Sequence, residues 1–201
     1  MTKLGDRPSS TRGSRRREEI VRAGVDLLVE AGWPAVTTRR VAARAGVNVG
    51  LIHYHFGGLA QLRAAITQRA AEDLGDPVVH ELLGADGARA VVDAMRRLLP
   101  ETADDERRAR LAMEVMAGAL REPGLAAAGE DQLRQLRAAL ADRLGELYPD
   151  WPAPRRTGAA TLLLALLEGL VLHRLLDPQL PVDEAMDALG ALAERADDGR
   201  G

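Results

Sequence analysis

Residues 37–56, TTRRVAARAG followed by VNVGLIHYHF, predict two short helices joined by a tight turn. Thr38 is a good N-cap for the first helix, and Gly46 ends it after about two turns with a residue that readily takes positive φ. Asn48 can cap the second helix, which we expect to run from Val49 to about His55. Two short helices with a glycine-containing turn between them form a helix-turn-helix.

The spacing of small and apolar residues supports this interpretation. Ala42 is small where the two helices would cross closely, and Gly46 follows four residues later, where the turn needs positive φ. Val47 and Ile52 supply apolar contacts that fix the angle between the helices. N-terminal to this motif we expect a helix over residues 14–31 whose apolar stripe faces the same core. The stripe consists of Ile20, Gly24, Leu27, Leu28 and Ala31, and Gly32-Trp33-Pro34 ends the helix.

The composition predicts an all-α protein. Aromatic residues make up 2% of the 201-residue chain, while Ala, Leu, Arg and Glu abound. The chain has no cysteine, which excludes a disulfide scaffold, a Cys-ligated zinc site and a cysteine nucleophile. We find neither a signal peptide nor an apolar segment of the roughly 20 residues that cross a bilayer, so we expect a cytoplasmic protein without a membrane partner.

Charge is distributed unevenly along the chain. Residues 1–60 carry ten cationic and five acidic side chains, whereas residues 61–201 carry 17 and 25. A basic N-terminal part on an acidic remainder suggests that the first part meets a polyanion such as DNA. The alternative is a solvated basic tail, and the two are compatible because basic arms often order only on contact with nucleic acid.

The segment Thr38 to Leu62, TRRVAARAGVNVGLIHYHFGGLAQL, resembles the DNA-binding domain of TetR-family transcriptional regulators. The family pattern is approximately T-x-x-x-I-A-x-x-A-G-V-S-x-G-x-L-Y-x-H-F-x-x-K-x-x-L. The positions that match it in register are Val41, Ala42, Ala45, Gly46, Val47, Gly50, Ile52, His55, Phe56 and Leu62, and Thr38 and Tyr54 each lie one residue after its Thr and its Tyr. Three departures are His53 in place of a common Tyr, Leu59 in place of the usual Lys near a phosphate, and Gly57-Gly58 before the fourth helix.

The resemblance implies that the chain binds double-stranded operator DNA through the helix-turn-helix. The residues expected to contact DNA are Thr38, Arg39, Asn48, Val49, Gly50, His53, Tyr54 and His55. Tyr54 and His55 can donate hydrogen bonds to phosphate oxygens, and Thr38 lies at a helix N-terminus, where phosphate binds readily. Asn48 can hydrogen-bond a base or cap its helix, and we favour the cap.

Helical segments separated by prolines and glycines fill the remainder. We expect helices at 59–74, 88–99, 104–120, 124–147, 154–176 and 182–197, with a break at 75–87. The predicted organisation is a flexible basic arm (1–13), a three-helix helix-turn-helix head (14–58) and a helical bundle for ligand sensing and dimerisation (59–201).

The helix expected at 154–176 is apolar nearly all round between residues 159 and 176. Such a helix is buried on more than one side, and a partner chain is the natural second cover. This pattern resembles the last two helices of the TetR family, which form a four-helix dimer interface. We therefore expect a homodimer through residues 154–197, the alternative being a helix fully buried in a monomer.

No catalytic constellation, phosphate loop or metal site emerges, so we expect no enzyme activity, no cofactor and no metal. His53 and His55 are two residues apart and point away from each other on a helix. Met113, Met116, Glu114 and His173 are candidates for contacting a small, largely apolar effector. The alternatives are that the methionines fill the core and that His173 is a core or interface histidine.

These observations favour a ligand-responsive DNA-binding regulator, a repressor released from its operator by a small molecule. The alternative is a DNA-binding regulator or architectural protein without such a switch. A third class, a helical enzyme or chaperone in which the hairpin is merely structural, is disfavoured by the motif and by the charge distribution.

Overall fold

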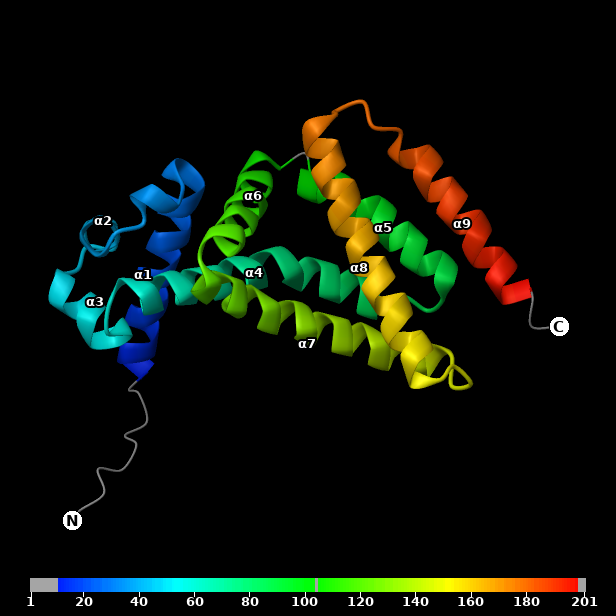
Figure 1. The fold of residues 1–201 in the computed structure, drawn as a ribbon, viewed down its shortest axis with the longest axis horizontal. Helices are drawn as coiled ribbons and strands as arrows, with labels where there is room; N and C mark the ends of the chain where they lie inside the picture. Colours follow the sequence, from blue (N-terminus) through cyan, green and yellow to red (C-terminus); the bar gives the residue numbers. More distant parts are fainter. Residues whose placement is uncertain (1–10, 104, 199–201) are drawn as a thin grey trace, which may run out of the picture. The chain divides into compact units, whose positions relative to one another are not determined.

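The computed structural model describes residues 11–103 and 105–198, and within these ranges every regular element is helical (Figure 1). The elements are α1 (Thr11–Ala31), η1 (Trp33–Ala35), α2 (Thr38–Arg44), α3 (Val49–Phe56), α4 (Leu59–Leu83), α5 (Ala88–Ala103), α6 (Glu106–Arg121), α7 (Pro123–Leu147), α8 (Ala153–Leu176) and α9 (Val182–Asp198). The all-α prediction is confirmed. The predicted arm over 1–13 lies outside the described residues up to position 10, and α1 begins at Thr11.

The chain divides into two compact units. The first comprises Met1–Ala70 and Glu114–Ala128, and the second comprises Ala71–Met113 and Gly129–Gly201. Three helices, α4, α6 and α7, therefore contribute residues to both units. The first compact unit extends along α4 beyond the predicted boundary at residue 58 and takes in the end of α6. The compact units therefore do not test that boundary between DNA-binding and ligand-binding domains, which stays a prediction.

The core of the first unit forms where α1, α2, α3 and α4 place their apolar stripes. The predicted face of α1 is buried, with Ile20 and Leu28 at 0% exposure. The other fully enclosed side chains are Val36, Val41, Ile52, Leu62, Ile66 and Thr67. Thr67 is the polar member of this set, and its hydroxyl donates to the Arg63 carbonyl at 3.1 Å, which satisfies the buried group.

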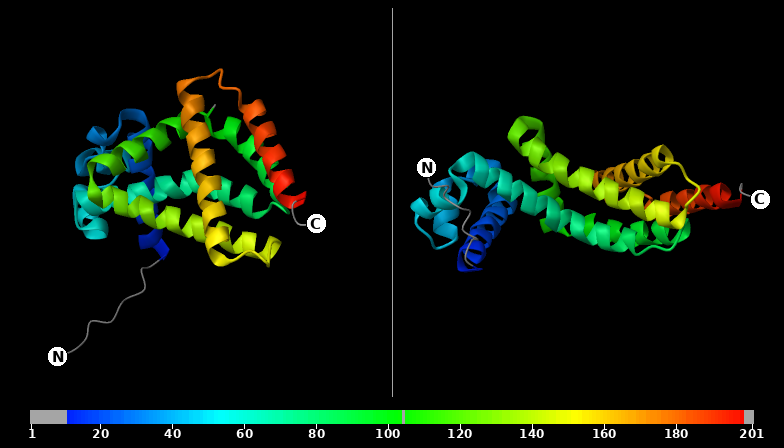
Figure 2. Two further views of the ribbon diagram at one scale, coloured as in Figure 1. Left: turned by 45° about the vertical axis from the view of Figure 1, so that its right-hand side comes forward. Right: turned by 90° about the horizontal axis from the view of Figure 1, so that it is seen from below.

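The second unit is built around α5, which packs against α8 and α9 (Figures 1 and 2). Met95, Leu98 and Leu99 of α5 are at most 1% exposed. They share a core with apolar residues of α7, α8 and α9, namely Leu136, Leu140, Leu144, Ala160, Leu164, Leu167 and Met186. The i, i+3, i+4 spacing of these residues explains why each of these helices buries one stripe.

The fourth helix is longer than the sequence predicts. We expected a break over 75–87, but α4 continues through Pro77 to Leu83. Proline has no N–H to donate to the carbonyl four residues earlier, which here belongs to Asp73. Arg108 of α6 replaces that donor, with its Nη2 3.4 Å from the Asp73 oxygen. Burial of Leu82 against the core of the second unit also favours the extra turns.

The helix α5 likewise extends beyond its predicted end at residue 99 and includes Pro100. Its start is fixed by a side chain from a distant part of the chain. The Ala88 N–H donates to the Tyr148 hydroxyl at 3.2 Å, which satisfies one of the free N–H groups at the helix N-terminus. Tyr148 in turn stacks on Trp151, with ring centroids 4.6 Å apart.

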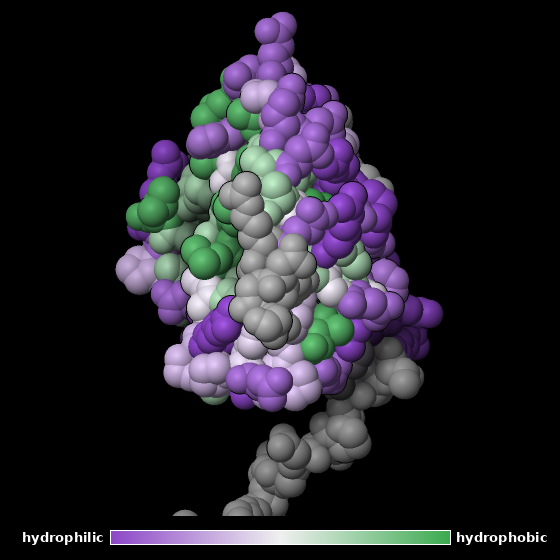
Figure 3. Space-filling model, turned by 90° about the vertical axis from the view of Figure 1, so that its right-hand side faces the viewer, coloured by the Kyte–Doolittle hydropathy of each residue, from purple (hydrophilic) through white to green (hydrophobic). Residues whose placement is uncertain are grey.

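The helix α8 has one buried face and one exposed face. Ala160, Leu164 and Leu167 are buried, whereas Leu162 and Leu176 are 66% and 74% exposed. By length and composition α8 is also the one described helix that could cross a membrane. Apolar side chains are visible between charged ones on the side of the molecule where α9 lies (Figure 3). The second unit therefore leaves apolar surface without a cover from its own chain.

Candidate DNA-binding surface

Two capped helices and a glycine turn build the helix-turn-helix. The N-cap of α2 is Thr37, whose Oγ1 accepts from the Arg40 N–H at 3.3 Å, so our assignment of the cap to Thr38 is wrong by one residue. Two threonines are adjacent here, and only the extended backbone at Thr37 (φ −122°, ψ 154°) places its hydroxyl over the first turn. The prediction that Asn48 caps α3 is confirmed, with Oδ1 2.9 Å from the Leu51 nitrogen.

The turn between the helices depends on Gly46, which takes φ 63°. The Val47 N–H then donates to the Ala42 carbonyl at 2.9 Å and closes the connection. Ala42 and Ile52 are 2% and 0% exposed, as expected for the crossing point of the two helices. The polar side chains of α3 are thereby held on the opposite, outer side of a rigid hairpin.

The eight predicted contact residues all lie on α2, on α3 or at the cap between them. Arg39, Asn48, Gly50, His53 and Tyr54 are exposed, and Tyr54 is 84% exposed. Thr38, Val49 and His55 are half-buried. Tyr54 stays outside the core that Ile52 and Phe56 enter, and its ring meets the neighbouring His55 ring edge-on, with centroids 5.1 Å apart.

The cations of α2 fall into two groups that the sequence does not separate. Arg44 forms a two-bonded ion pair with Glu30 of α1, at 2.7 and 2.5 Å, and the pair raises the pKa of Arg44. Arg39 and Arg40 are exposed and form no ion pair within the described part of the chain. Arg44 therefore holds α2 on α1, while the other two cations are free to meet phosphates. The predicted contact residues include Arg39 but not Arg40, although both are exposed on α2.

Asn48 can perform both roles that we considered for it, because they use different atoms. Its Oδ1 accepts the capping hydrogen bond from the Leu51 N–H. The amide nitrogen of the same exposed side chain takes no part in that bond and keeps its two donors. The cap therefore orients the amide group at the start of α3 without using up its capacity to contact a base.

The four candidate effector residues occupy different surroundings. Met113 and Met116 are 44% and 46% exposed on α6. Glu114 is engaged within its own unit, where its carboxylate accepts from the Trp33 N–H. His173 is exposed on α8, on the outer face that also carries Leu162 and Leu176. Within the described residues, no three His, Asp or Glu side chains are grouped as a metal site.

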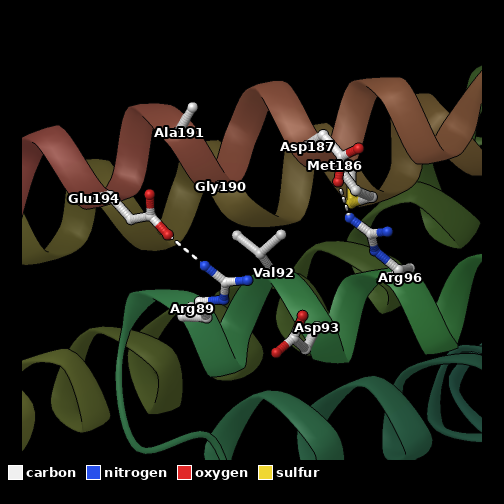
Figure 4. Close-up of a pocket in the computed structure, with 9 residues that line it drawn as sticks. All are labelled: Arg89, Val92, Asp93, Arg96, Met186, Asp187, Gly190, Ala191 and Glu194. Atoms are coloured by element: carbon white, nitrogen blue, oxygen red, sulfur yellow. Dashed lines mark hydrogen bonds and ion pairs between the residues drawn. The ribbon is translucent and has the colours of Figure 1, made fainter.

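A hollow of about 180 Å³ lies in the second unit between α5 and α9 (Figure 4). Charged residues dominate its lining, which consists of Arg89, Val92, Asp93, Arg96, Met186, Asp187, Gly190, Ala191 and Glu194. Arg89 pairs with Glu194, and Arg96 pairs with Asp187 at 2.6 Å, which raises the pKa of Arg96. These two ion pairs connect α9 to α5, and Asp93 adds a further carboxylate to the lining, so the hollow differs from the apolar site expected for an effector.

Two family models match successive parts of the chain. The model for bacterial regulatory proteins of the tetR family matches residues 20–66. The model for the C-terminal domain of BetI-type transcriptional repressors matches residues 85–197, more than half of the chain. The first match covers the helix-turn-helix, and the second covers all of α5 to α8 and most of α9.

Individual proteins show the same likeness. The HTH-type transcriptional regulator BetI 1 of Chromohalobacter salexigens is 27% identical over 190 residues, which is 92% of this chain and 89% of that protein. A crystal structure of a regulator from Streptomyces coelicolor A3(2), SCO7518, superposes with a TM-score of 0.75 and 30% identity, covering 89% of this chain and 98% of that one. The multidrug binding protein EbrR in complex with ethidium superposes with a TM-score of 0.70 and 28% identity, covering 89% and 98%.

Proposed function

The chain belongs to the TetR family of bacterial transcriptional regulators, and on that premise we propose that it is a repressor which a small molecule releases from its operator DNA. That it is a transcriptional regulator follows from the family, which is not a class of enzymes. The proposal adds four points: the contact residues on DNA, the homodimer, the effector and a cytoplasmic location.

One observation carries the DNA-binding part of the proposal, the 84% exposure of Tyr54 on the outer side of α3. A phenol in this position can donate to a phosphate oxygen, and Arg39 and Arg40 on α2 add free positive charge beside it. Phosphate contacts set the position of a protein on DNA, whereas contacts with base edges carry the sequence information. We assign the first role to Thr38, Arg39, Tyr54 and His55, and the second to the start of α3 with Asn48, Val49, Gly50 and His53.

Tyr54→Ala and Thr38→Ala should each weaken binding to operator DNA about tenfold, from loss of about one charge-assisted hydrogen bond. These contacts are made with the sugar–phosphate backbone of the DNA. The affinity for a duplex of random sequence should therefore fall by the same factor as the affinity for the operator. Thr37 provides the cap of α2, so Thr38→Ala should leave the far-UV helical signal unchanged. The measurement is a gel-shift titration against a duplex that the wild-type protein selects from random-sequence DNA.

Leu120→Ala is the matched control for these variants. Leu120 is 83% exposed on α6, so its truncation shortens an exposed side chain without changing the net charge or touching the helix-turn-helix. Wild-type affinity in both Tyr54→Ala and Thr38→Ala would contradict the assignment of the DNA-binding surface.

We propose that residues 154–197 form the homodimer interface. The exposed apolar face of α8 supports this, because Leu162 and Leu176 otherwise remain in water. A membrane is the competing cover for an apolar helix of this length. A dimer would also present two recognition helices, one from each chain, to the two halves of a palindromic DNA site.

The proposed effector is a small, largely apolar molecule bound within the helical bundle, with Met113 and Met116 as contact candidates, whereas His173 lies on the outer face of α8 that we assign to the dimer. EbrR binds ethidium, a planar cation of the kind that stacks on aromatic rings. In this chain the only aromatic residues after Phe56 are Tyr148 and Trp151. These two rings stack on each other, and Arg155 lies 4.2 Å from the centre of the Trp151 ring. A ligand held by van der Waals contacts with Leu, Val and Met is therefore favoured over an aromatic cation.

An effector of this kind should raise the melting temperature and weaken operator binding at the same concentrations, since it acts through its differential affinity for two states. We expect aliphatic and alicyclic compounds to produce both shifts and ethidium to produce neither. The measurement is thermal denaturation paired with gel shift over a compound panel. A panel without a compound that moves both quantities would favour the alternative, a DNA-binding regulator without a small-molecule switch.

A further inference from the structure

The connection between α1 and α2 buries three of its side chains, although it also contains an exposed proline and a glycine. Trp33, Ala35 and Val36 are 7%, 2% and 0% exposed. This connection leads directly into Thr37, the cap of the first helix of the helix-turn-helix. The position of this short segment therefore determines where α2 begins.

α6 contacts this segment through Trp33. The Trp33 indole Nε1 donates to the Glu114 carbonyl at 2.7 Å, and the Trp33 backbone N–H donates to the Glu114 carboxylate at 3.3 Å. One residue of α6 thus satisfies two donors of a buried tryptophan. Left unpaired, each donor would destabilise the fold, because a buried N–H without a partner has lost its hydrogen bonds to water.

The indole lies against the backbone of α6 at Gly118. A Cβ atom at Gly118 would come within 2.5 Å of the Trp33 Nε1 atom and 2.9 Å of Cε2, closer than van der Waals contact allows. Gly118 lies one turn after Glu114, on the same side of the helix. The close approach of the ring to the helix requires glycine at this position.

Arg63 of α4 completes the arrangement from the other side. Its guanidinium donates to the carbonyls of Trp33 and Val36 at 3.1 and 3.3 Å, and to the carboxylate of Glu122 at 2.8 Å. Its side chain is only 19% exposed, so these bonds are partly shielded from water. We call Trp33, Arg63, Glu114, Gly118 and Glu122 together the Trp33 clasp. Glu114 and Gly118 lie on α6 and Glu122 directly follows its last residue, Arg121, so the three come at intervals of four residues on one side.

We infer that Glu114 and Gly118 are positioning residues for operator binding, which fix the start of the helix-turn-helix to α6 through the Trp33 clasp. The inference rests on the proposed binding of operator DNA. All members of the clasp belong to the first compact unit, while α6 also contributes residues to the second. α6 is thus, like α4 and α7, shared by the two units, and it contacts the segment that immediately precedes the DNA-binding motif.

If the Trp33 clasp is loosened, the position of the helix-turn-helix should vary more. Two recognition helices bind half-sites at a fixed spacing, so one inserted base pair at the centre of the operator shifts and rotates one half-site. The wild-type protein should discriminate strongly between the selected operator and this lengthened one. We compare the affinity for the selected operator with the affinity for the lengthened one. Gly118→Ala and Glu114→Ala should each reduce the ratio of these two affinities about fivefold, the equivalent of one lost hydrogen bond.

The comparison uses the full-length protein and both duplexes, with far-UV circular dichroism to check the fold. Glu114→Gln keeps an oxygen that can accept from the Trp33 N–H and should behave like the wild type. Gly124→Ala is the matched control for Gly118→Ala, because a Cβ atom there meets nothing within 4 Å. Glu130→Ala, at an exposed position of α7, controls for the lost charge.

Reduced discrimination in Gly118→Ala and Glu114→Ala, restored in Glu114→Gln, would support the inference. Parallel loss of affinity for both duplexes with an unchanged ratio would overturn it, because the clasp would then only stabilise the fold. Wild-type behaviour of both variants would overturn it as well, while leaving operator binding intact. Failure of the wild-type protein to select any duplex would instead refute the proposed function, and the inference with it.

Discussion

Leu166→Arg is expected to convert the proposed dimer into a monomer of about the 21.6 kDa chain mass. Leu166 is 42% exposed on α8, beside Leu162, on the face that the chain itself leaves uncovered. In a two-fold dimer each substitution appears twice, and an unpaired charge buried in an apolar interface costs about 3–5 kcal/mol. The dissociation constant should therefore rise by more than about 100-fold.

Sedimentation or light scattering at micromolar concentration measures this change, and Leu162→Arg should reproduce it. Leu120→Arg is the matched control, since Leu120 is 83% exposed on α6 and lies outside the proposed interface. A wild-type protein that sediments as a monomer would refute the dimer. If the apolar face of α8 instead meets a membrane, the wild-type protein should partition into the membrane fraction and the arginine variants should not.

Leu170 requires a different expectation, although it lies one turn from Leu166 on the same helix. Leu170 also lies within the residues 154–197 that the sequence assigns to the dimer interface. The structure packs Leu170 against the core of its own unit, which includes Leu167 and Met186. An arginine at this position should therefore lower the melting temperature of the protomer, and dissociation would follow only from unfolding.

Gly24→Ala is expected to destabilise the protein by about 1–3 kcal/mol, even though alanine is the better helix former. Gly24 is buried in α1, and a Cβ atom there would lie 2.6 Å from Cγ1 of Ile66 in α4. Ile66 is fully buried, so its side chain would have to shift within the core to make room. The overpacking should outweigh the gain in helix propensity and reduce the melting temperature.

Gly129→Ala is the matched substitution with the opposite expected sign. Gly129 also lies inside a helix, α7, but a Cβ atom there meets nothing within 4 Å. Helix propensity alone should then raise stability by about 0.5–1 kcal/mol. Thermal melts of both variants against the wild type measure the two effects. Stabilisation by Gly24→Ala would show that α1 and α4 do not approach as closely as described.

The helix-turn-helix could be predicted almost completely from the sequence. Its caps, its turn and its helix lengths depend on interactions between residues that are close along the chain, such as Asn48 with Leu51 and Gly46 with its neighbours. Such interactions leave a direct trace in residue type and spacing. The family pattern added the functional meaning, and each predicted contact residue lies on this hairpin.

The tertiary structure decided the questions that depend on residues far apart in the sequence. Arg108 supplies the donor that Pro77 lacks, so α4 continues where local rules end it. Glu30 separates the role of Arg44 from that of Arg39, although the two residues look equivalent in the sequence.

Glu114 shows the same limit most clearly, since a carboxylate between two methionines suggested a ligand contact, whereas its bonds are with Trp33, 81 residues away. A residue's partner across such a distance is set by how helices pack. Packing depends on the fit of many side chains at once, and no local pattern records it.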